Sequence, residues 1–146
     1  MPRPLSPLEA EALGVTTLHE EMDNGELRFR LRFGDGSSYI RTQAALQSSG
    51  WQNSHLHRHV HELNVIQQGA MVVVEEREGE LSVRVIRTGE FYLCPQNVPH
   101  NSYMAPGTVA HTVKYGQDLP QADWVACPHL DTLCRTLDPE ALLSNS

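Results

Sequence analysis

The feature that most constrains the fold is a strict alternation of apolar and charged residues over positions 27–33. The segment is Leu27, Arg28, Phe29, Arg30, Leu31, Arg32 and Phe33. Successive side chains of a β-strand point to opposite faces, so this segment predicts a strand with an apolar and a charged face. A Gly-Asp-Gly turn at 34–36 leads into residues 37–42 and completes a predicted hairpin. We expect the three arginines to form its solvated face.

The same pattern continues as far as about residue 115. Further strand-like segments, separated by turns that contain glycine or proline, lie at 64–76, 81–87, 91–95, 100–104 and 110–116. Many short strands with regular turns are typical of a β-sandwich or barrel. We therefore predict an all-β fold and a single domain over residues 1–146, with a core at about 27–115.

The two ends of the chain differ from this core. Near the N-terminus, Ser6 as N-cap, Pro7 at the first helical position, Glu9 in a capping box and Gly14 as a stop predict a short helix. From about residue 120 the pattern dissolves into an irregular tail with weak helical character at 138–143.

Charge and composition exclude several classes of partner. Eleven Lys and Arg against 18 Asp and Glu give a net charge of -7, which opposes binding to nucleic acid. The apolar run at 70–74 is too short to cross a bilayer, and the N-terminus lacks the apolar core of a secretory signal. Cys94, Cys127 and Cys134 form no Cys-x-x-Cys pair, so we expect free thiols in a cytoplasmic protein.

Half of the chain's eight histidines lie within one short segment. They are His55, His57, His59 and His61, and Glu62 follows directly. Residues two apart share a face of a strand, so two imidazoles could meet one ion at roughly 2.0–2.2 Å. Four could not, because a regular strand advances about 3.3 Å per residue. Glu62 could return to the ion after a turn, and His100 could reach it from across a barrel.

The segment around these histidines resembles the first motif of the cupins, G-x5-H-x-H-x3or4-E-x6-G. The matching residues are Gly50, His55, His57, Glu62 and Gly69. The only departure is that one residue fewer separates the first glycine from the first histidine.

A second segment resembles the other cupin motif, G-x5-P-x-G-x2-H-x3-N. Gly89, Pro95 and His100 match it. Asn97 replaces the second glycine and Met104 replaces the final asparagine. Asparagine tolerates a left-handed backbone better than most residues, so we expect the turn to survive.

The resemblance covers about residues 27–115. It implies a double-stranded β-helix, a jelly-roll-like barrel that holds one metal ion, with the ligands His55, His57, Glu62 and His100. His61 is the alternative to Glu62, and the six-residue step from Glu62 to Gly69 favours the carboxylate. We expect His59 and His61 to lie in a loop or at the barrel mouth without a ligand role.

Strand parity adds residues that would line the cavity. Trp51 and Asn53 share a face with His55, Asn64 with Glu62, and Ser102 with His100. Arg41 and Tyr39 share a face of an early strand, where they could bind an anionic substrate or lie on the solvated exterior. The candidate substrate-binding residues are thus Arg41, Asn53 and Asn64.

Three imidazoles and a carboxylate suit Fe(II), Mn(II), Ni(II) or Zn(II), and we expect Fe(II). Residues 87–101 resemble the small ring-cleaving cupins such as the hydroxyanthranilate dioxygenases. We therefore predict a metal-dependent oxidoreductase, a dioxygenase of a small aromatic or enol substrate. A lyase or isomerase that uses the metal as a Lewis acid is the alternative.

A binding module is the competing class of function. Residues 57–69 and 94–100 also resemble the sensory cupin domain of arabinose-type transcription regulators, which binds a small ligand, often without metal. Those proteins continue into a helix-turn-helix segment, which we do not expect in this short, acidic chain. Cupins commonly pair through strand edges, so we expect a homodimer.

Overall fold

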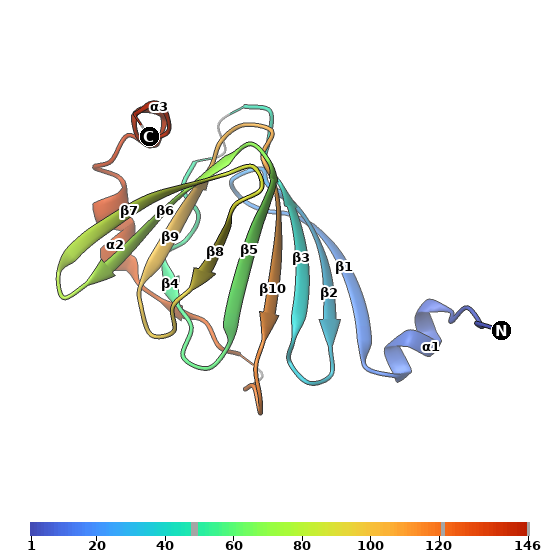
Figure 1. The fold of residues 1–146 in the computed structure, drawn as a ribbon. Helices are drawn as coiled ribbons and strands as arrows, with labels where there is room; N and C mark the ends of the chain where they lie inside the picture. The colour runs from blue at the N-terminus through green and yellow to red at the C-terminus, as the bar shows by residue number, and fades with distance from the viewer. Residues whose placement is uncertain (48–49, 121, 146) are drawn as a thin grey trace.

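The computed structural model describes residues 1–47, 50–120 and 122–145, and two antiparallel sheets dominate it (Figure 1). The six-stranded sheet has the order β1 (Val15–Glu21), β2 (Leu27–Phe33), β3 (Ser38–Gln43), β10 (Val109–Tyr115), β5 (His61–Gln68) and β8 (Phe91–Cys94). The five-stranded sheet has the order β11 (Val125–Ala126), β4 (His55–Leu56), β9 (His100–Met104), β6 (Ala70–Arg77) and β7 (Glu80–Arg87). The predicted all-β, jelly-roll-like fold is confirmed.

Strand β6 shows where the core lies, because both of its faces are covered. Met71 and Val73 belong to an apolar cluster between the sheets, and Val72 and Val74 belong to a second cluster on the outer face. The second cluster includes Leu130 of helix α2 (Pro128–Cys134). Residues 70–74 are apolar without alternation for this reason, since a strand buried on both faces needs no polar side.

Two turns of the cupin motifs have the backbone that their residues predict. Gly69, with φ of +88°, ends β5, and a Cβ at this position would lie 2.3 Å from Oγ1 of Thr108. Only glycine fits so close an approach. Asn97 has a φ of 61°, so the asparagine in place of the second motif glycine does adopt the left-handed conformation.

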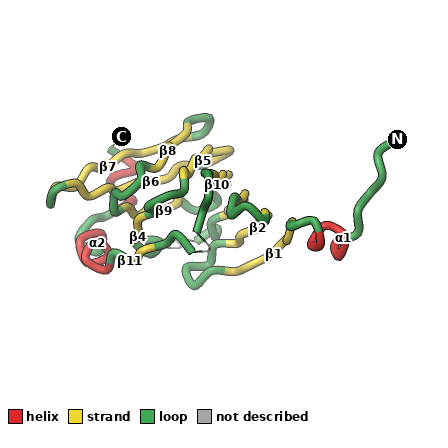
Figure 2. The backbone as a smooth tube through the Cα atoms, turned by 90° about the horizontal axis from the view of Figure 1, so that it is seen from below, coloured by secondary structure: helices red, strands yellow, loops and turns green. Residues whose placement is uncertain are grey.

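The N-terminal helix α1 (Pro7–Ala12) has the predicted capping box, in which Ser6 and Glu9 exchange hydrogen bonds. Figures 1 and 2 show α1 projecting away from the sheets, and none of its residues is buried. Helix α3 (Pro139–Ser144) matches the weak helical signal in the tail. Strands β1 and β11 and helix α2 were not predicted. No helix in the described ranges combines the length and apolar character that a membrane span requires.

The prediction for the first hairpin was right in its alternation and wrong in its faces. Arg28 and Arg30 on β2 expose only 17% and 15% of their side chains, whereas Leu27 and Phe33 are 51% and 41% exposed. Arg28 pairs with a buried carboxylate, Glu26. Arg28 and Arg30, each paired with a carboxylate, therefore turn toward the barrel interior, whereas Arg32 is exposed as predicted.

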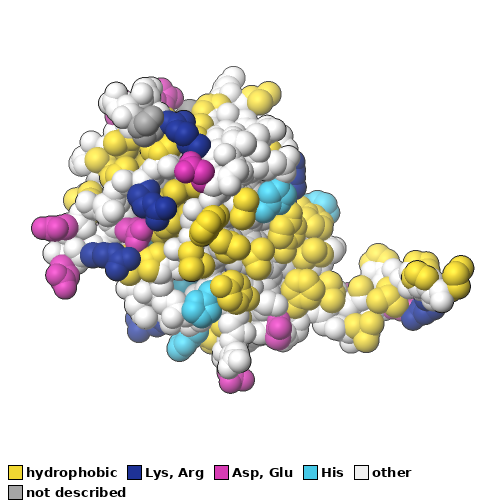
Figure 3. Space-filling view, in the orientation of Figure 1, with side chains coloured by type: hydrophobic (Ala, Val, Ile, Leu, Met, Phe, Trp, Pro, Cys, Tyr) yellow, Lys and Arg dark blue, Asp and Glu magenta, His cyan; other side chains and the backbone are white. Residues whose placement is uncertain are grey.

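The outer face of the six-stranded sheet is correspondingly apolar. Exposed apolar side chains lie on several of its strands: Val65, Phe91, Leu93, Val113 and Tyr115. The space-filling view shows hydrophobic side chains gathered over this sheet (Figure 3).

Candidate metal centre

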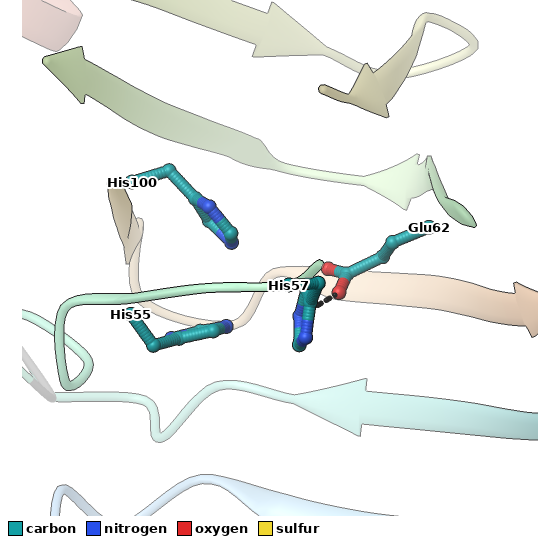
Figure 4. Close-up of side chains that lie close together, drawn as sticks. All are labelled: His55, His57, Glu62 and His100. Atoms are coloured by element: carbon teal, nitrogen blue, oxygen red, sulfur yellow. Dashed lines mark ion pairs between the residues drawn. The ribbon is translucent and has the colours of Figure 1, made fainter. Parts of the chain in front are cut away.

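Four side chains converge inside the barrel, and they are His55, His57, Glu62 and His100 (Figure 4). One potential ligand atom from each lies within 4.8 Å of all the others. His55 on β4 is directly opposite His100 on β9 in the sheet register, with ring centroids 4.4 Å apart. His57 follows β4, and Glu62 comes from β5 in the other sheet. The site therefore joins the two sheets.

All three histidines are oriented in the same way. Each Nδ1 lies at hydrogen-bonding distance from a backbone carbonyl oxygen: Asn53 for His55 at 2.7 Å, Asp123 for His57 at 2.5 Å, and Val98 for His100 at 3.1 Å. A carbonyl only accepts, so each Nδ1 carries the proton and donates it. The lone pair is thereby left on Nε2, which is how outer contacts prepare histidines for a metal.

The charge states also suit a metal. Burial, together with the neighbouring His100, lowers the pKa of His55 to about 3, and burial also lowers the pKa of His100. Burial would raise the pKa of Glu62, but the adjacent His57 ring and the charge of Lys114 hold that pKa well below its usual range. Near neutral pH the site thus holds neutral imidazoles at His55 and His100 and an ionised carboxylate at Glu62, the forms that bind metals.

Two atoms of the group lack normal hydrogen bonds. His57 Nε2 and Glu62 Oε2 are 2.9 Å apart, yet both are buried without a hydrogen-bond partner among the described residues. With the His57 proton on Nδ1, Nε2 and the carboxylate oxygen are both acceptors, so neither can donate to the other. Buried polar atoms are rarely left in this state, and an ion between them would satisfy both. The residues present therefore fit a divalent metal.

Asn64 orients the carboxylate of this group. Its Nδ2 donates to Glu62 Oε1 at 3.2 Å, and its Oδ1 accepts from Thr112 Oγ1 at 2.7 Å. The hydrogen bond from Asn64 occupies Oε1 of Glu62 and leaves Oε2 facing the histidines. Asn64 was predicted to share a face with Glu62, and its buried side chain lies beside that residue in the cavity.

The segment that presents His57 is fixed by a residue that the sequence did not suggest. The carboxylate of Asp123 accepts three backbone N–H groups, from Arg58 and His59 at 2.9 Å and from Val60 at 2.7 Å. These bonds replace the strand pairing that the segment lacks, since β4 ends at Leu56. Asp123 lies in the tail that looked irregular, and no spacing rule connects it to the histidines.

The cavity has a volume of about 70 Å³ and is lined by side chains that include His55, Glu62, Asn64 and His100. A more open pocket of about 480 Å³ shares Arg28, Gln52, His55 and Lys114 with it and forms its mouth. Trp124, half exposed, stacks on His55 at this mouth, with ring centroids 5.4 Å apart.

Two residues predicted to face the cavity lie elsewhere. Asn53 is exposed in the mouth pocket, and Trp51 packs edge-on against Tyr103. Gln52 lines the cavity instead, with Ser102, which had been predicted there. Residues 52–54 are not in a strand, so the alternation used to place Trp51 and Asn53 does not hold.

Arg41 also lies outside the cavity. Its neighbours Ile40 and Thr42 line the cavity, so the alternation of β3 turns Arg41 to the outer face, where it bonds Gln43. Tyr39 is on that outer face as well, with its hydroxyl 2.6 Å from His111 Nδ1.

The two remaining histidines of the cluster do not join the group. His59 and His61 are both exposed, and the ring of His61 lies against Tyr115. Of the two alternatives, Glu62 and not His61 therefore lies with the other three side chains.

Comparison with known proteins gives structural matches only. No family model and no curated protein matches the sequence. An oxalate oxidase is similar with a TM-score of 0.57 and 21% identity, covering 73% of this chain and 57% of that one. KdgF from Halomonas sp. is similar with a TM-score of 0.54 and 17% identity, covering 68% and 86%. Bacillus subtilis oxalate decarboxylase, with Mn(II) centres, has a TM-score of 0.60 and 13% identity, covering 75% and 30%.

The matches span less than two thirds of the oxidase and of the decarboxylase. At these identities the likeness concerns the fold, and these neighbours are cupin proteins. The two antiparallel sheets, with four side chains converging between them, agree with it. The chain has a cupin fold.

Proposed function

We propose that this chain is a mononuclear metal-dependent cupin enzyme that acts on a small molecule. The observation that carries the proposal is the convergence of one ring nitrogen from each of three histidines and one carboxylate oxygen, all within 4.8 Å of one another. The proposed ligands are His55, His57, Glu62 and His100. Their Nδ1 hydrogen bonds and the orphaned atoms of His57 and Glu62 support this assignment.

Three nitrogen donors and one oxygen donor suit Fe(II), Mn(II), Ni(II) or Zn(II). We propose Fe(II), and Mn(II) is its main competitor because a structural neighbour has Mn(II) centres. When bound, the ion would supply Lewis acidity and, in the case of iron, redox chemistry towards O₂.

The protein's own residues would position the metal ligands and limit the access of water. Asn64 holds Glu62 in place, and the backbone carbonyls fix the protons of the histidines on Nδ1. Apolar residues, among them Met71 and Val73, line the inner wall of the cavity and limit the water within it. A restricted amount of water strengthens electrostatic interactions with a substrate and prevents side reactions.

For the reaction, we propose a dioxygenase of a small aromatic or enol substrate that presents adjacent oxygen or nitrogen atoms to the metal. The cavity of about 70 Å³ would receive those atoms, and an aromatic ring would extend into the mouth pocket of about 480 Å³. A non-redox lyase or isomerase is the second candidate. Its support is that neighbours on this fold include a decarboxylase as well as an oxidase, so the fold alone does not select the reaction.

The test is anaerobic reconstitution with Fe(II), Mn(II), Ni(II) and Zn(II) separately, followed by oxygen-electrode assays with catechols, aminophenols and 1,3-diones. We expect O₂ uptake with Fe(II) and none in a His57→Ala control. Turnover without O₂ uptake, or equal turnover with Zn(II), would instead support the lyase or isomerase. A metal-free protein that binds a sugar or aromatic acid would favour the stand-alone sensor.

We also propose that the active form is a homodimer in the cytoplasm. Exposed apolar side chains on the outer face of the six-stranded sheet, such as Phe91 and Leu93, support a second copy there. Light scattering should give the mass of a dimer, and a Phe91→Lys variant should shift it to the monomer. A wild-type monomer at micromolar concentration would contradict the proposal.

A further inference from the structure

Two cationic side chains line the same cavity as the four candidate ligands. Arg28 reaches it from β2, and Lys114 reaches it from β10. Their side chains are only 17% and 24% exposed. Arginine and lysine are rarely buried, because their charges lose hydration. Two such side chains turned into a barrel therefore indicate a function inside it.

Arg28 is fixed in place but only partly satisfied. Its Nη2 donates to Glu26 Oε2 at 2.8 Å. Glu26 is fully buried and is held in turn by Gln52 Nε2, at 2.9 and 3.1 Å. The Nε of Arg28 is buried and has no hydrogen-bond partner among the described residues. The guanidinium is thus an oriented donor group with unused capacity, the kind that binds carboxylates well.

Lys114 has unused capacity as well. Its Nζ lies 3.7 Å from Glu62 Oε2, which is longer than a hydrogen bond. An ammonium group carries three donors, and this contact leaves them available. Lys114 and Arg28 also line the mouth pocket, so a ligand that enters from solvent passes both.

The balance of charge favours an anion. In the protein alone, Arg28 and Lys114 are offset by the carboxylates of Glu26 and Glu62. A divalent ion held by the candidate ligands would add positive charge that no further side chain of the cavity wall offsets. Uncompensated buried charge is costly, and an anionic ligand would remove that cost.

The cavity also limits the size of the ligand. Its volume is about 70 Å³. At roughly 10–15 Å³ for each water-sized group, it has room for about five to seven such groups. A short carboxylic acid, or the carboxylate end of a longer molecule that reaches into the mouth pocket, is of this size.

We infer that the substrate carries a carboxylate, and that Arg28 and Lys114 bind this group beside the metal; the inference rests on the proposed function and names its class of substrate. Arg28 provides oriented hydrogen-bond donors to the carboxylate. Lys114 provides a positive charge that attracts the carboxylate as it passes from the mouth pocket to the metal. The enol or aromatic substrates to examine first are therefore those that bear an acid group.

The experiment is a calorimetric titration of the full chain, both loaded with Mn(II) and free of metal. The probes are acetate, glycolate and malonate, each compared with its neutral amide. The variants are Arg28→Met and Lys114→Met, and Arg32→Met is the matched control because Arg32 is an exposed arginine on the same strand. Elemental analysis gives the metal content of each protein.

We expect the loaded wild type to bind each carboxylate at least 10-fold more tightly than its amide. Arg28→Met should lose on the order of 10- to 100-fold in carboxylate affinity, as for the loss of one charge-assisted hydrogen bond, with its metal content unchanged. Arg32→Met should bind like the wild type. Equal affinity for acids and amides, or full carboxylate affinity in Arg28→Met, would overturn the inference.

Failure of the metal proposal gives a different result. If elemental analysis finds no metal in the wild type, the proposed function is wrong, and the metal-free titrations then decide on the anion site. Carboxylate binding that Arg28→Met abolishes would still support it, and absence of binding would overturn it. If Arg28→Met does not fold, the comparison of acids with amides on the wild type decides alone.

Discussion

The loop that carries His57 depends on one carboxylate, so Asp123→Ala is the most informative change outside the candidate metal centre. Asp123 accepts the backbone N–H groups of Arg58, His59 and Val60. Alanine removes all three bonds at once, while its backbone carbonyl can still accept from His57 Nδ1. We therefore expect a less stable protein in which the backbone carbonyl of residue 123 still holds the ring of His57.

The magnitude follows from the surroundings of each donor. Val60 is 6% exposed, so its N–H would remain without a partner, at a cost of about 1.5–3 kcal/mol for a bond to a charged group. Arg58 and His59 are exposed, so water would replace the carboxylate there and each loss would cost about 0.5–1 kcal/mol. The free energy of unfolding should fall by about 2.5–5 kcal/mol.

Urea unfolding of the metal-free protein, followed by far-UV circular dichroism, measures this loss. Asp23→Ala, at an exposed loop position, is the control and should change stability by less than about 0.5 kcal/mol. Metal affinity of Asp123→Ala should fall about 10-fold, as when a group that supports a metal ligand is disturbed. An unfolding free energy equal to that of Asp23→Ala would refute the reasoning.

Two further predictions concern the metal ligands and the motif glycine. His57→Ala and His100→Ala should each lose most of the bound metal in elemental analysis, whereas His59→Ala should retain it because His59 is exposed; full occupancy in the first two would contradict the assignment. Gly69→Ala should lower the free energy of unfolding by about 2–4 kcal/mol, because a Cβ would clash with Thr108 and the left-handed backbone is strained for alanine. An alanine variant as stable as the wild type in urea would contradict the close contact between Gly69 and Thr108.

The sequence predicted the fold wherever regular alternation or a motif was present. The short strands with their turns led to the two facing sheets, and the two cupin motifs led to His55, His57, Glu62 and His100, which do converge. Side-chain parity also located Asn64, because β5 is a regular strand.

Strand parity failed to place side chains where the backbone is irregular. It also failed where the alternation alone does not show which face of a strand is buried. Residues 52–54 are not in a strand, so Gln52 and not Asn53 lines the cavity. On β2, alternation distinguishes two faces but does not say which one is inside, and buried Glu26 decides this by pairing with Arg28. A carboxylate next to the strand was the only available signal.

Contacts between distant segments were beyond prediction from one sequence. Asp123 holds the segment of His57, and Trp124 stacks on His55. Both residues lie far along the chain from these histidines. Nothing in a short polar tail distinguishes an aspartate that binds three backbone amides from one that is solvated. Such a residue is identified only when the fold brings the two segments together.

The central claim is that one metal ion lies among these four side chains, and an anomalous-scattering map tests it most directly. Crystals of untagged protein, reconstituted without oxygen with Fe(II) or Mn(II), would be measured at the absorption edge of the metal. The account predicts a single strong peak within bonding distance of the Nε2 atoms of His55, His57 and His100 and of a Glu62 oxygen. No peak at this position, or a peak bound to His59 or His61 instead, would contradict it.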